Sequence, residues 1–244
     1  MEEWNYQTAE DLDQTLAERL RRFPREPDIF VYGARLAGAL TIRLLLKAWH
    51  RFTIRGQEHL PRQGSFIMVA NHSSHLDALC MLSALPMGKL HHAFPAAAAD
   101  YFFVSLPRLA LASIIVNALP FHRQTNLRQS VSLCQNLLAN DSPGNILILF
   151  PEGTRSTNGQ MNPFKPGIGK LVAGTSLPVL PCYLDGAGKA WPKGTWCPRP
   201  CRVTLTIGQP RQFQSYGQSR EDHDAIAAEL YQAVQELAEQ KPAE

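Results

Sequence analysis

A histidine and an aspartate five residues apart, His72 and Asp77, follow directly after a run of apolar residues. An imidazole whose Nδ1 proton is held by a carboxylate can take a proton from an alcohol at Nε2, and such a base contributes about 10²- to 10⁴-fold in rate. On one ideal helix the two side chains would point apart. They can meet only if His72 lies in a turn and Asp77 in the first turn of the next helix. Taken alone, the pair is equally compatible with a structural histidine.

A second group of polar residues lies in the segment 150–156, which follows another apolar run. Glu152 could hold an acceptor hydroxyl group, and the guanidinium of Arg155 could pair with a phosphate. Taken alone, this segment is also compatible with a plain turn that carries a surface arginine. Ligands of open α/β sheets gather beyond the carboxyl ends of the strands, which is where both segments are expected.

The elements that must position these residues are short apolar runs alternating with longer segments of helical spacing. The runs predict strands at residues 52–54, 65–70, 146–150, 178–184 and 203–207. Helical spacing predicts helices from Ala78, over residues 127–138 and over residues 226–237. This alternation predicts an α/β fold in one domain, with a mainly parallel sheet flanked by helices.

The N-terminal part of the chain is expected to form amphipathic helices ahead of that domain. Residues 11–22 have a helical pattern, and residues 29–57 contain five basic side chains and no acidic one. Arg43, Lys47 and Arg51 recur every fourth residue, so on a helix they form a basic stripe beside apolar residues. Such a helix can lie on anionic lipid, or it can pack on the core with a solvated basic edge. We therefore divide the chain into a helical arm, residues 1–51, that can associate with a membrane, and a domain, residues 52–244.

Composition narrows the partners and the compartment. A net charge of +3 argues against nucleic acid as a partner. No run of about 20 apolar residues is evident, and the acidic N-terminus is unlike a secretory signal. We expect a peripheral protein at the cytoplasmic face of a membrane. The odd number of scattered cysteines predicts free thiols rather than disulfides, although two of them could contribute to a zinc site: Cys80, Cys134, Cys182, Cys197 and Cys201.

Together the two polar segments resemble the phospholipid and glycerol acyltransferase family, typified by bacterial 1-acylglycerol-3-phosphate acyltransferases. The first motif of that family, Asn-His-x-Ser-x-x-Asp, is matched by Asn71, His72, Ser74 and Asp77. The third, Phe-Pro-Glu-Gly-Thr-Arg-Ser, is matched without a change by residues 150–156. Arg123 corresponds to the arginine that ends the second motif, and residues 177–181 correspond to the fourth. The resemblance extends over residues 52–207.

The resemblance implies a glycerolipid acyltransferase that needs no metal or other cofactor. Its donor would be acyl-CoA or acyl carrier protein, and its acceptor a lysolipid, most simply 1-acylglycerol-3-phosphate. His72 would deprotonate the acceptor hydroxyl group, and Asp77 would orient His72. The acceptor would be bound by Arg123, Glu152, Gly153, Thr154 and Arg155. A different lysolipid or glycolipid acceptor, a non-catalytic lipid-binding protein and a metal-dependent hydrolase are the alternatives.

Two features depart from the family pattern. Family members that acylate lysophosphatidic acid usually carry lysine between the first and second motifs, where this chain has residues 94–100 without any lysine. His122 stands where an acidic residue usually precedes the arginine of the second motif. These departures leave the phosphate of the acceptor open, but not the acyl transfer. Residues 82–121 are rich in apolar side chains and are expected to meet an acyl chain or a membrane, or simply to pack in the core.

Overall fold

The computed structural model describes residues 28–98, 105–121, 127–139, 144–157, 159–192 and 194–240, together with Thr15, Glu18 and Phe23. The helix predicted over residues 11–22 falls almost wholly outside the described residues. Arg123 and His122 also lie outside them, as do residues 99–104 of the apolar stretch.

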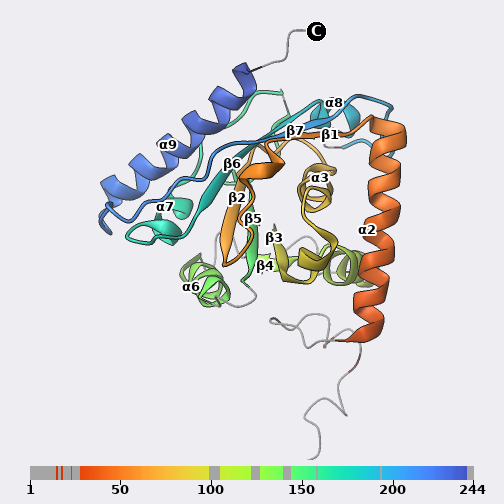
Figure 1. Cartoon of the computed structure of the whole chain (residues 1–244), viewed down its shortest axis with the longest axis horizontal. Coiled ribbons are helices and arrows are strands. Elements are labelled where there is room, and N and C mark those ends of the chain that lie inside the picture. The colour runs from red at the N-terminus through yellow and green to blue at the C-terminus, as the bar shows by residue number, and fades with distance from the viewer. Residues whose placement is uncertain are drawn as a thin grey trace, which may run out of the picture.

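A seven-stranded sheet forms the centre of the molecule, in the order β1-β7-β6-β2-β5-β3-β4 (Figure 1). Every neighbouring pair is parallel except β6 and β7, which are antiparallel. This arrangement confirms the predicted α/β fold with a mainly parallel sheet. The strands are β1 (Thr53–Arg55), β2 (Phe66–Ala70), β3 (Ala93–Ala98), β4 (Leu119–Phe121), β5 (Ile146–Leu149), β6 (Val179–Asp185) and β7 (Thr204–Ile207).

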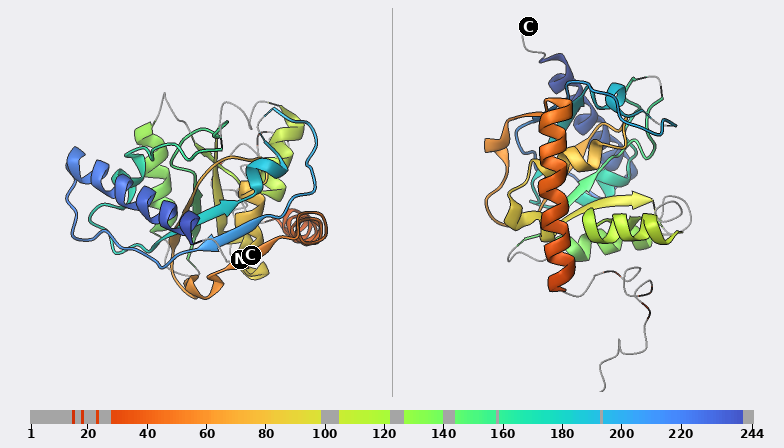
Figure 2. Two further views of the ribbon diagram at one scale, coloured as in Figure 1. Left: turned by 90° about the horizontal axis from the view of Figure 1, so that it is seen from above. Right: turned by 90° about the vertical axis from the view of Figure 1, so that its right-hand side faces the viewer.

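Helices cover both faces of this sheet (Figures 1 and 2). One face is covered by α6 (Leu127–Leu138), α7 (Gly167–Val172) and α9 (Arg220–Glu239). The other is covered by α2 (Ile29–His50), α3 (Asp77–Ser83) and η3 (Leu111–Ile115). The shorter elements are η1 (Gln57–His59), η2 (Met87–His92), α5 (Leu106–Ala110) and α8 (Ala187–Ala190).

The central strand β2 shows why the sequence forms three layers. All five of its side chains are fully buried, as expected for a strand covered on both faces. Successive side chains of a strand point to opposite faces. Phe66, Met68 and Ala70 accordingly join the apolar core on the α2 and α3 side. Ile67 and Val69 join the core on the α6, α7 and α9 side.

The strand β3 is missing from the strands that the sequence predicts. It contains four alanines and one proline, which are residue types that strands use rarely. It forms because β5 and β4 pair with it on its two sides, so its place in the sheet outweighs its own propensity.

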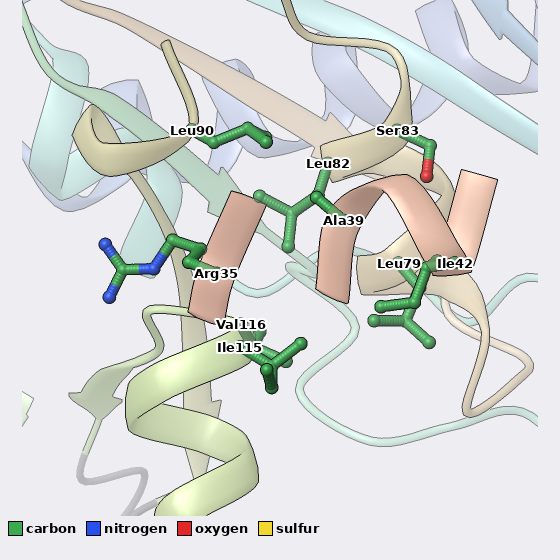
Figure 3. Close-up of a pocket in the computed structure, with 9 residues that line it drawn as sticks. All are labelled: Arg35, Ala39, Ile42, Leu79, Leu82, Ser83, Leu90, Ile115 and Val116. Atoms are coloured by element: carbon green, nitrogen blue, oxygen red, sulfur yellow. The ribbon is translucent and has the colours of Figure 1, made fainter. Parts of the chain in front are cut away.

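The helix α2 packs against the domain partly through two arginines, Arg35 and Arg43. The side chain of Arg35 is 4% exposed and donates to the carbonyl oxygens of Ile114 and Ser113, at 2.9 and 3.1 Å. Burial lowers the pKa of Arg35 to about 10. Arg43 donates to the carbonyl oxygen of Leu85. Figure 3 shows this inner face of α2 against α3 and η3. Of the expected basic stripe, Arg43 therefore turns inward, whereas Lys47 and Arg51 are exposed.

The outer face of α2 is apolar, and it corrects one expectation from the sequence. Among the described residues, α2 is the one helix that is long and apolar enough to cross a membrane, judged by length and composition alone. The expectation that no such segment exists was wrong, because scattered arginines interrupt the apolar run without lowering its mean hydropathy enough. Only 11% of its apolar window is buried. Its exposed large side chains are Ile29, Phe30, Leu40, Leu44, Leu45 and Trp49.

Candidate active site

The two polar segments meet at the carboxyl edge of the sheet. They follow β2 and β5, which are neighbouring parallel strands with Val69 paired to Leu149. The chain therefore leaves both strands on the same side, and His72 comes to lie beside Phe150. Their rings stack with centroids 4.3 Å apart and an interplanar angle of 19°. The predicted position of both segments at this edge is confirmed.

His72 and Asp77 form the hydrogen bond that their spacing predicts. His72 Nδ1 lies 2.8 Å from Asp77 Oδ2, with His72 in the turn and Asp77 as the first residue of α3. The backbone amides of Ser73 and Ser74 donate to the same oxygen, at 2.7 and 2.8 Å. Asp77 is fully buried, so the turn and the helix hold its carboxylate in one position. The catalytic roles of the pair stay a prediction.

His72 lines open space beside the site, and its Nε2 is not engaged by Asp77. Among the residues that the structure describes, no protein group forms a hydrogen bond with this nitrogen, and the side chain is 18% exposed. Since the bond to Asp77 engages Nδ1, the neutral ring that donates to the carboxylate carries its lone pair on Nε2. This arrangement suits a group that accepts a proton from a substrate.

Glu152 ties the two segments together. Its carboxylate is buried, and Oε1 accepts from the backbone amide of His72 at 2.6 Å. Oε2 accepts from both the backbone and the side-chain nitrogen of Asn162, at 2.9 Å each. The amide of Ser156 in turn donates to the carbonyl oxygen of His72, at 2.8 Å. Sequence reasoning placed Glu152 at the substrate and missed Asn162. The only feature of the sequence that could have pointed to Asn162 is that it is a polar residue ten positions after Glu152.

Asn71 fixes the His72 turn to the other neighbouring strand, β6, and Ser74 fixes it to the C-terminal end of α8. The side chain of Asn71 donates to the carbonyl oxygen of Leu184 and accepts from its amide, so it continues the pairing of β2 with β6 beyond the strand end. The hydroxyl group of Ser74 donates to the carbonyl oxygen of Trp191, at 2.8 Å. These bonds give the polar residues around His72 a structural purpose that the sequence alone did not reveal.

Gly153, Thr154 and Arg155 line the open space around His72. Gly153 has a φ of +73°, and a Cβ atom there would lie 2.7 Å from Lys165 Nζ. Arg155 lies against the ring of His75, with Nη1 2.7 and 2.6 Å from the two ring nitrogens. Burial, and then the Arg155 cation, lower the pKa of His75 below its ordinary value. The predicted binding residues 152–155 thus surround His72, while Arg123 lies outside the described residues.

His72 lines three cavities that the described residues form. The α2-side cavity, of about 610 Å³, lies between the sheet and α2, α3 and η3, and Thr154 and Arg155 line it. The α6-side cavity, of about 290 Å³, lies on the opposite face of the sheet and is lined by residues of α6 and α7 and by Lys165. The polar cavity, of about 390 Å³, is lined by residues that include Glu152, Asp185 and Lys189. Apolar side chains dominate the first two.

The residues that the structure describes contain no group of three or more His, Cys, Asp or Glu side chains placed to hold a metal ion. The expectation of a reaction without metal or cofactor stays a prediction. Cys80, Cys134 and Cys182 are buried free thiols. Burial raises the pKa of Cys134 to about 12, so this thiol stays protonated near neutral pH.

Comparison with known proteins points to one family. A family model described as Acyltransferase matches residues 51–185. A 1-acyl-sn-glycerol-3-phosphate acyltransferase from Limnanthes alba is 28% identical over 191 residues, which are 78% of this chain and 64% of that protein. The alpha form of such an enzyme from Ovis aries is 33% identical over 141 residues, 55% of this chain and 45% of that protein. The chain therefore spans about half to two thirds of the length of these relatives.

The fold also matches a solved structure. The crystal structure of the 1-acyl-sn-glycerophosphate acyltransferase from Thermotoga maritima has a TM-score of 0.63 with this chain at 24% sequence identity. The match covers 91% of this chain and 87% of the other. At this level of identity the likeness establishes the fold.

Proposed function

The chain belongs to the acyltransferase family, whose model matches more than half of its length, and on that premise we propose that it acylates a lysophospholipid. The donor is a thioester, either acyl-CoA or acyl carrier protein, and the acceptor is most simply 1-acylglycerol-3-phosphate. The names of its relatives from Limnanthes and Ovis support this acceptor class. Another lysolipid or a glycolipid is the alternative acceptor.

One observation carries the proposal. His72 is held at Nδ1 by a buried aspartate, while its Nε2 faces cavities large enough for lipid chains. In the proposed reaction, Nε2 takes the proton of the acceptor hydroxyl group as its oxygen attacks the thioester carbonyl carbon. The tetrahedral intermediate then expels the thiolate, which takes the proton back from His72. Asp77 orients the ring and stabilises its cationic form between the two proton transfers.

The acceptor head group is proposed to lie near Arg155 and Thr154, which line the α2-side cavity together with His72. A guanidinium pairs well with phosphate. Lys165 supplies a further cation at the mouth of the α6-side cavity, beside Gly153. The strand β3 carries alanines where the lysine of the family was expected. The positive charges of Arg155 and Lys165 are proposed to offset part of that missing charge. Glu152 is proposed to position the His72 backbone rather than to bind the acceptor.

The protein is proposed to work at a membrane surface with α2 lying on the lipid, peripherally and at the cytoplasmic face. Its outer apolar face supports contact with lipid. Its inner face packs on α3, η2 and η3 along much of its length. A helix with the domain at its side cannot cross a bilayer while the domain stays in water. Lying flat is therefore favoured over crossing.

The function is tested by following thiol release from acyl-CoA with purified protein, and by repeating the reaction with acyl carrier protein as donor. The acceptors are 1-acylglycerol-3-phosphate and the matching 1-acylglycerol, which lacks the phosphate. We expect release that depends on the acceptor and that falls by at least about 10²-fold in the His72→Ala variant.

A matched control is His223→Ala, which removes a histidine from the surface of α9 and should leave the rate unchanged. Equal rates with the two acceptors would remove the phosphate from the proposal but keep the acyl transfer. Absence of acceptor-dependent release with both donors, or full activity of His72→Ala, would refute the proposed reaction.

A further inference from the structure

The loop that joins α8 to β7, residues 191–203, presents a tryptophan to solvent. Trp196 is 95% exposed, the largest value among the exposed large apolar side chains of the described residues. The turn before it is held by hydrogen bonds. The hydroxyl group and the amide of Thr195 donate to the carbonyl oxygen of Pro192, at 2.9 and 3.3 Å, and Trp191 Nε1 donates to the carbonyl oxygen of Thr195, at 3.0 Å. The exposure of Trp196 is therefore fixed by an ordered turn.

The same segment is basic. Residues 186–203 contain four Lys or Arg residues and no Asp or Glu. The side chains of Lys189, Arg199 and Arg202 are exposed. Among the described residues, no carboxylate forms an ion pair with any of these three. Exposed cations without acidic partners attract an anionic surface, and that attraction weakens as the salt concentration rises.

The α8–β7 loop lies beside the carboxyl end of α2. The amide of Val203 donates to the carbonyl oxygen of His50, the last residue of α2, at 3.0 Å. At this end of α2, Trp49 is 53% exposed, and Lys47 and Arg51 are exposed as well. The right-hand view of Figure 2 shows α2, the loop and η3 on the same side of the molecule. The loop therefore extends the exposed surface of α2 sideways.

The same three elements border the α2-side cavity. Its lining includes Ile42 of α2, Leu111 of η3 and Trp191 at the start of the loop. Leu111 is 53% exposed, so apolar surface continues from α2 onto η3. His72 lines this cavity too. Exposed apolar side chains and exposed cations thus lie together around the cavity that leads to the proposed base.

We propose that the α8–β7 loop is a second lipid contact, which binds an anionic membrane surface alongside α2. Trp196 enters the boundary between lipid and water, where a tryptophan ring is favoured because its body is apolar and its N–H group stays hydrated. Arg199 and Arg202 pair with anionic head groups.

A second contact has a geometric consequence for the molecule on the membrane. A single helix that lies on lipid leaves the molecule free to rotate about the helix axis. A contact beside that axis stops the rotation and keeps the α2-side cavity turned toward the lipid. The proposal rests on the proposed location at a membrane surface and does not depend on the acyl transfer.

The test measures sedimentation of the full chain with vesicles of phosphatidylcholine alone and with vesicles of equimolar phosphatidylcholine and phosphatidylglycerol. Trp196→Ala removes the ring, and Arg199→Glu with Arg202→Glu reverses two charges. The matched control is Lys170→Glu with Arg220→Glu, which makes the same change of charge on α7 and α9, on the opposite face of the sheet. All five side chains are exposed, so thermal unfolding should change little.

We expect Trp196→Ala to lower binding about tenfold on both kinds of vesicle. The variant with both arginines reversed should lose at least about tenfold on the anionic vesicles only, and added salt should reduce the difference. The control should lose much less at physiological salt, because charges farther than a Debye length from the membrane are screened.

Loop variants that bind vesicles as well as the unmodified protein would overturn the proposal and leave α2 as the lipid contact. An equal loss in the control would also overturn it, since the effect would then come from net charge. If the arginine variant kept vesicle binding but lost kcat/KM with acyl carrier protein as donor, the loop would bind that carrier instead of lipid. Each of these results leaves the acyl transfer intact, whereas absence of transfer by the unmodified protein would count against the proposed function itself.

Discussion

At the scale of single residues, Glu152 holds the backbone of His72 in position. Its two oxygens accept three hydrogen bonds, one from the His72 backbone and two from Asn162. Bonds to a charged acceptor contribute more than neutral ones, and a buried donor that loses its acceptor costs free energy. The position of the base therefore depends on a residue in the other motif.

The substitution Glu152→Gln tests this dependence. Glutamine has one oxygen and one NH2 group, so the NH2 group would face the N–H donors of either His72 or Asn162. At least one hydrogen bond is therefore lost. We expect a lower free energy of unfolding, by about 1.5–3 kcal/mol in chemical denaturation, and a fall in kcat larger than any change in KM for the acceptor. Glu229→Gln is the control, because it removes the charge from an ion pair with Arg211 whose side chains are 36% and 34% exposed, and it should cost less than about 1 kcal/mol. A raised acceptor KM with unchanged kcat and stability would return Glu152 to substrate binding.

The sequence was sufficient to predict the meeting of His72 and Asp77, because a turn followed by a helix leaves few other geometries. The sequence was not sufficient to predict that Glu152 binds the backbone of His72. The bond from Glu152 to the His72 amide joins residues 80 positions apart, and its partner is a backbone group that no residue type reveals. The buried position of Arg35 could not be predicted for a similar reason, since its acceptors are backbone carbonyl groups of η3.

At the scale of elements, α2 is apolar on its outer face as well as on its inner face, where Leu46 lies in the core and Leu36, Ala39 and Ile42 pack against it. Its inner face places Arg35 and Arg43 against backbone carbonyl groups of the domain, where each guanidinium gains hydrogen bonds. Its outer face leaves Leu40, Leu44 and Leu45 more than half exposed. The outer face of an amphipathic helix in a soluble protein is usually polar, so the outer face of α2 departs from that pattern.

Sedimentation with liposomes tests which face meets lipid. The double variant Leu44→Glu with Leu45→Glu places charge on the apolar face, so we expect binding to fall strongly. Lys47→Glu changes charge on the same helix and serves as the control, with a smaller loss that salt reduces. The idea of an apolar docking face would be abandoned if the control lost as much binding as the double variant, or if neither lost any.

Elements with a strong pattern were predicted to within a few residues. The strand predicted at residues 65–70 and the helix predicted at residues 127–138 appear as β2 and α6. The first segment is an apolar run typical of a buried strand, and the second has apolar residues at helical spacing. The strand β3 could not be found in this way. Its alanines fit many structures, and only pairing with β4 and β5, which depends on distant segments, selects the extended one.

At the scale of the whole molecule, three partly or fully buried histidines link stability to pH. Burial lowers the pKa of His50, His75 and His91 below the ordinary value of 6.5. The unfolded chain therefore binds more protons than the folded chain as the pH falls below about 6.5. The stabilisation is complete above that pH and is lost as the pH falls toward the folded-state values.

Chemical denaturation at a series of pH values measures this dependence. We expect the free energy of unfolding to decline as the pH drops from about 7 to 5. The combined substitution His50→Gln and His91→Gln, which leaves the site around His72 unchanged, should make the decline shallower. An identical slope in the variant would assign the pH dependence to other groups.

The bond between Glu152 and His72 also has a consequence for how activity returns after denaturation. It bridges β2 and β5, which are neighbours in space but far apart along the chain. Contacts between distant segments form slowly, because a long loop must close first. The segment that carries His72 and Asp77 depends on Glu152 of the other segment for its position, so a half-formed sheet is expected to be inactive. In a refolding experiment, the time course over which acyl transfer returns would thus report when the central sheet forms.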